Sequence, residues 1–477
     1  MLEGLEISIV NFQSAKSIVN ELRWDSDYYK KEYLRAFEII HRIETLPFSS
    51  YCDFIKKGIF DLPPSNYREQ GIPLVRTTEI KNPTVNFHTT VYLEEATNRD
   101  NYKTILYPYD LVFTKIGAYI GDVAMLPDNY PEYNFSQNVA GALLKDKING
   151  PYLLAFFLSS LGRRQILRSM MLSGQGKLEL DDIRNYEIPT VSKNFKVALK
   201  KTIDSRLLKI KESKSSYENA ELILLKSLGL ANFQLSQEPV NIKSLSESFG
   251  NSGRLDAEYY QIKYEQVVER IMSTKYDRLA DIVKIKKSIE PGSAHYTEEG
   301  LPFVRVSDYD KFGLSTPDKY LTDEFCKENA QFIKKLKPKK ETILFSKDGS
   351  VGTAYMLRKD ADFITSSAIL HLTVKDKTKI IPEYLTLALN SKLVQMQAER
   401  DAGGSIILHW RVSEIENVVV PVIDFDKQRE IADLVEESFK LKKQSEHLLE
   451  VAKTAVEMAI EQDEETALEF INNQTII

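Results

Sequence analysis

The feature that most constrains this chain of 477 residues is an internal duplication. The segment RWDSDYY at residues 23–29 returns as RLDAEYY at 254–260, an offset of 231, and EQGIPLVR at 69–76 returns as EEGLPFVR at 298–305, an offset of 229. Five further matches keep the same order and nearly the same spacing. Ordered matches at one spacing are typical of tandem repeats. The chain therefore consists of two related units of about 230 residues.

Each unit has the same internal plan. Short β-branched and aromatic runs, punctuated by Gly and Pro, come first, and one long helical segment follows. Runs of the first kind predict strands, and the second pattern predicts a helix. The predicted fold is therefore mixed α+β, with two tandem-duplicated domains.

The two long segments carry heptad patterns. In residues 196–228 and in residues 428–465, apolar residues recur every seven positions, and a seam of small residues accompanies the second pattern. The heptad positions are Ile203, Ile210, Tyr217 and Leu224, then Leu434, Leu441, Leu448 and Ala455, and the small residues are Ser438, Ser445, Ala452 and Ala459. Heptads of this length favour helix-on-helix pairing over two surface helices that each cover their own domain. A two-fold arrangement of the units would make the pair an antiparallel two-helix coiled-coil rod separating the domains.

These patterns divide the chain into six segments. We predict a first domain at residues 1–190, a first spacer helix at 196–228, a linker at 229–253, a second domain at 254–422, a second spacer helix at 428–465 and a tail at 466–477.

Composition limits the surroundings and the partners. The net charge of -6 and the pI near 5.8 lack the basic signature of many nucleic-acid binders, so any DNA contact must use local patches. The two cysteines, Cys52 and Cys326, lie far apart and show no metal-ligand spacing. The sequence also offers no signal peptide and no apolar run long enough to span a membrane. These features predict a cytoplasmic protein without a membrane partner.

Several catalytic signatures are absent from the sequence. It contains no phosphate loop, no dinucleotide fingerprint, no G-x-S-x-G or HExxH motif, and no Asn/Asp-Pro-Pro-Tyr/Phe tetrapeptide. Glu79, Ile80 and Lys81 have the Glu-x-Lys form of a nuclease site, but the second unit lacks it, so we expect a solvated strand end. We therefore predict a chain without catalytic residues, metal or bound cofactor.

Two loops are the best candidates for reading DNA. Residues 114–121 and their copy at 346–352 place a hydroxyl, a lysine and glycines just beyond an apolar strand. Lysine and bare backbone can hold phosphates, and side chains that differ between the copies can read different bases. The alternative is a tight hairpin whose glycines serve positive φ alone. The candidate residues here are Lys115, Gly117, Tyr119, Lys347, Gly349 and Ser350.

Further polar candidates follow strands or lie in glycine-rich turns. An arginine at a strand end can fork onto guanine or phosphate, although it can equally cap a buried carboxylate. Amide and hydroxyl groups in glycine-rich turns suit groove or phosphate contacts, although helix capping explains them nearly as well. These candidates are Arg76, Thr77, Arg305, Ser307, Gln175, Lys177 and Ser405. A basic run at residues 334–340 is the densest positive patch in the chain.

Taken in order and in duplicate, these motifs resemble the specificity subunit of type I restriction-modification systems. The resemblance covers essentially the whole chain, and it includes GIPLVR at 71–76 with its copy at 300–305, the two lysine loops, and the closing segment from Gly403 to Ile431. It implies that each domain reads one half of a bipartite target in double-stranded DNA, and that the helices dock two methyltransferase subunits.

The same resemblance implies the chemistry of the partners. The methyltransferase subunits would flip a target adenine and methylate its N6 with S-adenosylmethionine, which this chain would not bind, and restriction or translocase subunits would join them. Residues 1–22 would also suit a type IIB-like or fused system. A third hypothesis is a tandem-domain protein-interaction scaffold without DNA binding, and steep salt dependence of binding to random duplex would argue against it.

Overall fold

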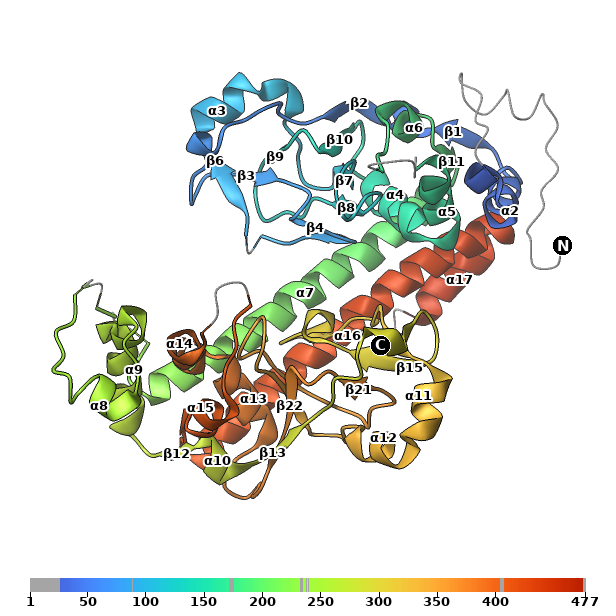
Figure 1. Cartoon of the computed structure of the whole chain (residues 1–477). Coiled ribbons are helices and arrows are strands. Elements are labelled where there is room, and N and C mark those ends of the chain that lie inside the picture. The colour runs from blue at the N-terminus through green and yellow to red at the C-terminus, as the bar shows by residue number, and fades with distance from the viewer. Residues whose placement is uncertain are drawn as a thin grey trace. The chain divides into compact units, whose positions relative to one another are not determined.

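The computed structural model describes residues 26–474, except 88, 171–175, 232–234, 237, 239 and 404–406. The described residues fall into two compact units. The first unit lies within the ranges Met1–Ile210 and Lys443–Ile477, and the second lies within Lys211–Lys442. The two units therefore share both long helices, because each boundary falls within one of them (Figure 1).

A four-stranded antiparallel sheet forms the centre of the first unit. Its order is β2-β10-β7-β8, with β2 at Cys52–Lys57, β10 at Val139–Leu144, β7 at Leu111–Thr114 and β8 at Val123–Met125. Phe113 and Ala140 face a core that includes the apolar helix α4 (Asn149–Leu158), while Val112 and Val139 face a second core. Strands β7, β8 and β10 are buried on both faces, which explains their nearly continuous apolar sequences, whereas β2 also carries exposed charged residues.

Smaller elements complete the first unit. A second sheet has the order β6-β3-β9, and two strand pairs are β1 with β11 and β4 with β5. The strands are β1 (Thr45–Pro47), β3 (Ile72–Val75), β4 (Ile80–Lys81), β5 (Thr84–Val85), β6 (Val91–Leu93), β9 (Asn134–Phe135) and β11 (Glu187–Pro189). The helices are η1 (Ser26–Tyr29), α2 (Lys31–Ile40), η2 (Phe48–Tyr51), η3 (Pro64–Asn66), α3 (Glu95–Asp100), η4 (Tyr102–Thr104), α5 (Ser160–Ser169) and α6 (Leu180–Arg184).

The second unit repeats this topology, with one added strand, β14, in its second sheet. Its main sheet has the order β13-β22-β19-β20, its second sheet β14-β18-β15-β21, and its strand pairs are β12 with β23 and β16 with β17. The strands are β12 (Tyr276–Arg278), β13 (Val283–Lys287), β14 (Tyr296–Thr297), β15 (Leu301–Val304), β16 (Tyr309–Asp310), β17 (Gly313–Leu314), β18 (Tyr320–Leu321), β19 (Ile343–Ser346), β20 (Ala354–Met356), β21 (Ile364–Thr365), β22 (Ile369–Val374) and β23 (Val419–Pro421). The helices are α8 (Phe249–Ser252), η5 (Ala257–Tyr260), α9 (Ile262–Met272), α10 (Leu279–Ile282), η6 (Ser293–His295), η7 (Val306–Asp308), α11 (Asp323–Glu328), α12 (Ala330–Leu336), α13 (Pro382–Asn390), α14 (Lys392–Asp401) and α15 (Val412–Glu416). The predicted mixed α+β fold with two tandem domains is confirmed.

Duplicated hydrogen bonds show that the two units match in detail. The buried Tyr152 donates its hydroxyl to the carbonyl of Pro189, and Tyr384 does the same to Pro421. The side-chain amide of Gln165 donates to the backbone carbonyl of Glu187 and accepts the backbone N–H of the same residue. Gln397 forms the same two hydrogen bonds with Val419. The repeat seen in sequence is therefore a repeat of interior contacts as well.

The two predicted spacer segments are helical. Helix α7 spans Lys193–Ser227 and α16 spans Phe425–Glu461. In the first unit, the start of α7 shares a core with the end of α16, and in the second unit the end of α7 meets the start of α16. The two helices thus run antiparallel in each unit. Small residues at the seam let the two helices form a pair of hydrogen bonds. Ser213 Oγ donates to the carbonyl of Ser438 over 2.7 Å, and Ser438 Oγ donates to the carbonyl of Ser213 over 2.8 Å.

The predicted tail differs from the structure. Residues 464–474 form a further helix, α17 (Glu464–Gln474), whose Ala467 and Ile471 are buried in the core of the first unit. The carboxylate of Glu464 also accepts the backbone N–H of Ser192 over 2.7 Å. Apolar residues four positions apart form one face of a helix, and this spacing was the signal that the sequence offered.

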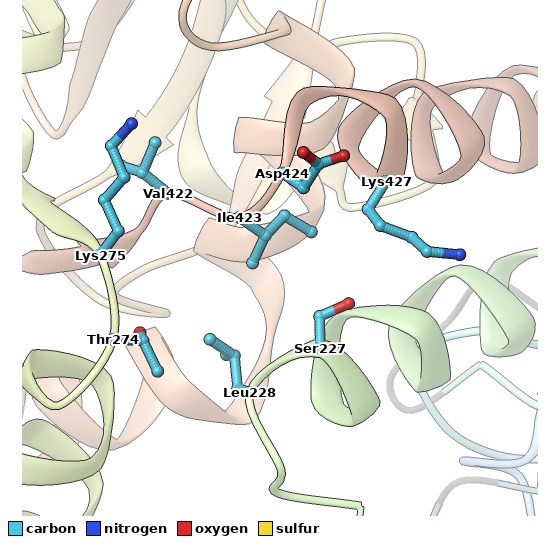
Figure 2. A pocket seen from close by; sticks show the side chains of 8 residues that line it. All are labelled: Ser227, Leu228, Thr274, Lys275, Val422, Ile423, Asp424 and Lys427. Atoms are coloured by element: carbon cyan, nitrogen blue, oxygen red, sulfur yellow. The ribbon is translucent and has the colours of Figure 1, made fainter.

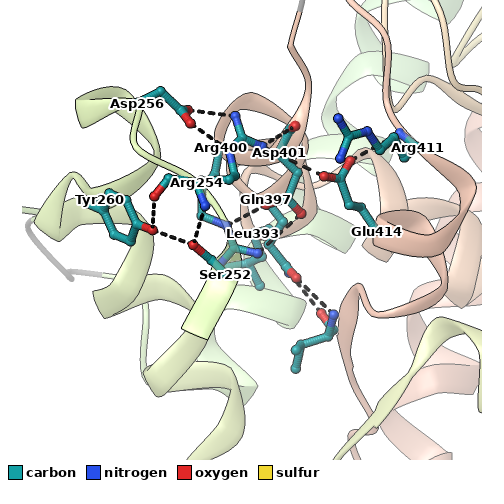
Figure 3. A network of polar contacts seen from close by, with 11 residues as sticks. Ser252, Arg254, Asp256, Tyr260, Leu393, Gln397, Arg400, Asp401, Arg411 and Glu414 are labelled. Atoms are coloured by element: carbon teal, nitrogen blue, oxygen red, sulfur yellow. Dashed lines mark hydrogen bonds and ion pairs between the residues drawn. The ribbon is translucent and has the colours of Figure 1, made fainter. Parts of the chain in front are cut away.

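The Arg-x-Asp-x-x-Tyr-Tyr motif that first revealed the repeat is structural in its described copy. Arg254 donates to both carboxylate oxygens of Asp256 and to the backbone carbonyl of Asp401, and it stacks 4.5 Å from the ring of Tyr259. Glu414 on α15 lies 3.8 Å from the same guanidinium. Figure 3 shows this network joining the segment before α9 to helices α14 and α15.

Candidate nucleic-acid interface

Arg76 follows strand β3, and its guanidinium is engaged inside the first unit. Its Nη2 and Nε donate to the two carboxylate oxygens of Glu79 over 2.7 and 3.1 Å, and Nη2 also donates to the carbonyl of Thr89. The side chain of Glu79 is completely buried. The expectation that Glu79 lies at a solvated strand end is therefore wrong, because Arg76 provides the paired charge that makes its burial tolerable.

Arg305 occupies the same position in the second unit and has the same kind of partner. Its backbone N–H donates to the buried carboxylate of Asp308 over 2.8 Å, as that of Arg76 does to Glu79. Its guanidinium pairs with the exposed Asp318 and lies 3.9 Å from Asp308. Both arginines therefore cap buried carboxylates, which was the structural alternative, and a DNA contact by either arginine stays a prediction.

Two hydroxyl candidates accompany these arginines. Ser307 is exposed and donates its hydroxyl to Asp308 over 3.1 Å. Thr77 is half-buried, and its Oγ1 lies 3.9 Å from the point where a Cβ on Gly117 would stand. The end of β3 and the lysine loop of the first unit are therefore neighbours in space.

The loop after β7 brings further candidates together. The N–H of Lys115 donates to the carbonyl of Asn138, and the carbonyl of Lys115 accepts the N–H of Leu178. Ile116 forms an isolated antiparallel bridge with Lys177. Gly117, at φ 124°, adopts a conformation that a side chain would strain. Lys115 and Lys177, more than 60 residues apart in sequence, thus share one edge of the first unit.

This edge is positively charged. Burial lowers the pKa of the half-buried Lys115, and the charges of Lys57 and Lys177 lower it further, while Glu179 opposes them. Lys177 is exposed and pairs with Glu179 over 2.5 Å. The charges of Lys57 and Lys177 thus add to the positive potential around Lys115, and an anion such as phosphate would relieve that repulsion.

An exposed aromatic ring lies on the same loop. Tyr119 is 51% exposed, and the ammonium of Lys81 stands 4.2 Å from the centre of its ring. A ring that is exposed and held beside a cation can contact a base or a sugar while the cation contacts the backbone. The position differs between the copies, since Val351 is its counterpart in the second unit.

The second loop repeats the backbone but changes the charge. The N–H of Lys347 donates to the carbonyl of Ala368, and its carbonyl accepts the N–H of Trp410. Its ammonium, however, forms an ion pair with the neighbouring Asp348, which also lies 2.9 Å from Nδ1 of His409. The sequence shows Asp348 where the first loop has Ile116, but the pairing with Lys347 requires the folded turn.

The other two candidates of the second loop, Gly349 and Ser350, are open to solvent. Gly349 has φ 73°, and nothing lies within 4 Å of the position of an added Cβ. Ser350 is exposed, and its carbonyl accepts the hydroxyl of Ser346. Two other candidates, Gln175 and Ser405, lie outside the described residues, so their contacts stay predictions.

The basic run of the second unit is mostly solvated. Lys334 and Lys335 are exposed at the end of α12, and Lys339 pairs with Asp360 over 3.0 Å. Within the described ranges, no group of three or more His, Cys, Asp or Glu residues could hold a metal ion. Likewise, no helix of the described chain is both long and apolar enough to cross a membrane.

A pocket of about 300 Å³ lies in the second unit, away from the candidate loops. Figure 2 shows its lining by the end of α7, the residues before β12 and the start of α16. The lining residues are Ser227, Leu228, Thr274, Lys275, Val422, Ile423, Asp424 and Lys427. None of them belongs to the predicted DNA-contacting set.

Two copies of one α+β domain, each with a lysine loop and each followed by a long helix, define a duplicated protein that presents the same kind of surface twice. A family model describing the type I restriction modification DNA specificity domain matches the chain twice, over residues 52–221 and 274–451. The chain belongs to this family.

Other comparisons add little to this assignment. Curated proteins gave no match. Among solved structures, the S subunit of a type I restriction-modification system from M. genitalium has a TM-score of 0.38 and 14% identity, with 90% of this chain and 96% of that chain covered. The HsdS subunit from Thermoanaerobacter tengcongensis has a TM-score of 0.27 and 12% identity, with 88% and 97% covered. The assignment rests on the family model.

Proposed function

We propose that this chain is the DNA-recognition subunit of a type I restriction-modification enzyme, and that each domain reads one half of a bipartite target. The observation that carries the proposal is the double match of one DNA specificity family to the two structural repeats. The lysines and the exposed Tyr119 on the loop edge of the first unit support it, because phosphate contacts position a protein on duplex DNA and side chains at base edges supply specificity.

The long helices are the proposed docking elements for two methyltransferase subunits. On α7, Leu208 and Leu222 are exposed by 54% and 39%, and they lie two heptads apart. Residues at this spacing occupy the same heptad position, and exposed apolar side chains along one helix suit contact with a partner helix. The partners would bind S-adenosylmethionine and methylate adenine N6, and restriction or translocase subunits would complete the enzyme. In this proposal the chain itself performs no catalysis.

Domain exchange tests the modular part of the proposal. Residues 24–190 would be replaced by the equivalent segment of a related protein, and the hybrid would be expressed in cells with the methyltransferase subunit. Methylation mapping should show one half of the target changed and the other half intact, because each domain carries its own recognition surface. Changes in both halves, or no methylation with the unexchanged chain, would contradict it.

Binding to random duplex DNA separates this proposal from a scaffold that binds only proteins. Each neutralised phosphate contributes about −0.9 to the slope of log affinity against log salt, so a DNA-binding subunit should show a steep slope. A protein-only scaffold should show weak binding and a slope near zero.

A further inference from the structure

A second pair of lysines is duplicated in this chain, outside the two loops. Strand β2 ends in Ile55, Lys56 and Lys57, and β13 ends in Ile285, Lys286 and Lys287, at an offset of 230. Before this shared Ile-Lys-Lys ending the two strands differ in sequence: β2 reads CDFIKK and β13 reads VKIKK. These lysines are exposed, so packing of the core does not explain why both copies have the pair at the same strand end.

The strand registers place one lysine of each pair beside the loop. Lys57 pairs with Ala140 on β10, and Ala140 pairs with Phe113 on β7, two residues before Lys115. In the second unit, Lys287 pairs with Leu370, and Leu370 pairs with Phe345, two residues before Lys347.

The registers of the two copies are therefore identical. Strands β2 and β7 both run antiparallel to β10, so they end at the same edge of the sheet, two strand spacings or about 10 Å apart. Lysine side chains that start from strands at that separation can reach different phosphates.

The alternation of side chains separates the members of each pair. Lys57 lies on the same face of its strand as Ile55, towards the loop, while Lys56 lies on the opposite face, where its ammonium stands 4.5 Å from the ring of Phe54. In the second unit Lys286 donates to the carbonyl of Lys335. Lys56 and Lys286 thus have local contacts on the face away from the loop. On the loop side, the ammonium of Lys57 stands 5.1 Å from the centre of the exposed ring of Phe60, and the strand registers place Lys57 and Lys287 at the loop edge.

The charges on that edge differ between the units. Lys57 and Lys287 are exposed, and no ion pair engages either of them among the described residues. Lys57 also adds to the positive field that lowers the pKa of Lys115. In the second unit the loop lysine is neutralised by Asp348, whereas Lys287, at the end of β13, has no ion pair among the described residues.

We propose that Lys57 and Lys287 each bind a phosphate of the DNA backbone, and that Lys287 rather than Lys347 is the principal phosphate contact of the second domain. The proposal rests on the proposed DNA-recognition function. It predicts an asymmetry: among the lysines of this edge that no carboxylate pairs with in the described residues, the first domain uses two, Lys57 and Lys115, and the second domain uses one, Lys287.

Fluorescence anisotropy of the full chain with a random-sequence duplex tests the proposal over a range of salt concentrations. Replacing Lys57 or Lys287 with Ala should reduce the magnitude of the salt slope by about 0.9 and weaken binding roughly 3- to 10-fold near 0.1 M salt. Lys347→Ala should change the slope by less than half of that amount. The matched controls are Lys56→Ala and Lys286→Ala, which remove the same charge from the opposite face of the same strands.

Each outcome decides between the two proposals. A wild-type chain without salt-dependent binding overturns the DNA-recognition function and this inference with it. A wild-type chain that binds, with Lys57→Ala and Lys287→Ala no different from their controls, overturns the inference alone. A Lys347→Ala effect larger than that of Lys287→Ala reverses the assignment in the second domain. Unchanged melting temperatures of all five variants exclude folding as the cause.

Discussion

Replacing Arg76 with Ala would leave a buried carboxylate without its cation. Glu79 is fully buried and accepts five hydrogen bonds, from the backbone N–H, Nε and Nη2 of Arg76 and from the hydroxyls of Thr78 and Thr89. The substitution removes the two bonds from the guanidinium and keeps the other three. Breaking a buried ion pair from one side costs about 3–5 kcal/mol. We expect about 3 kcal/mol here, because the remaining bonds still stabilise the charge.

The duplicate provides the control. In the second unit the guanidinium of Arg305 lies 3.9 Å from Asp308, and its closer partner, Asp318, is 63% exposed. Exposed ion pairs contribute about 0–1 kcal/mol, so we expect Arg305→Ala to cost about 1 kcal/mol. For units of this size, 1 kcal/mol shifts the melting temperature by about 2–4 °C. The expected shifts are thus about 6–12 °C for the first unit and 2–4 °C for the second.

Differential scanning calorimetry of the full chain measures these shifts. Hydrogen exchange followed by mass spectrometry assigns each transition to its unit, because a chain of two units need not unfold in one step. If Arg76→Ala melts like the wild type but loses its affinity for duplex DNA, then the arginine reads DNA and the structural argument is refuted. Equal shifts in both variants would show that the burial of Glu79 does not set the cost.

Three further outcomes follow from the packing. Burial lowers the pKa of His371 to about 4, with a further contribution from a neighbouring lysine. Below the ordinary pKa of 6.5 the unfolded chain therefore binds a proton that the folded unit does not. The free energy of unfolding of the second unit should fall by roughly 3 kcal/mol as the pH is lowered from 6.5 to 4. Calorimetry should not find this loss in His371→Gln. Gly141→Ala should destabilise the first unit by about 2–4 kcal/mol, since the new Cβ would stand 2.4 Å from Cζ of Phe135, and denaturant unfolding measures the loss. Ser213→Leu should lower the melting temperature of the second unit, because the buried Ser213 and Ser438 form hydrogen bonds across a seam that has no room for a larger side chain. A melting temperature equal to that of the wild type would contradict this packing.

The sequence alone determined the architecture of this protein. Two segments with matching patterns fold alike, so the duplication predicted two α+β domains before any contact was known. The heptads predicted long helices at 196–228 and 428–465, and the structure has them at Lys193–Ser227 and Phe425–Glu461. Patterns of this kind are local, and each residue contributes to them independently of its distant neighbours.

The tertiary structure decided what the candidate side chains do. The sequence predicted that Arg76 and Arg305 follow strands and either contact DNA or cap a buried carboxylate. Only the fold showed the buried carboxylates that they cap. Lys347 matched Lys115 in the sequence, but the folded turn brings Asp348 onto its ammonium. Charge at a surface depends on which groups meet there and on how far water is excluded, and both are set by contacts between segments distant in sequence. The sequence therefore showed two similar loops that differ by Asp348, and the structure showed that this carboxylate pairs with Lys347.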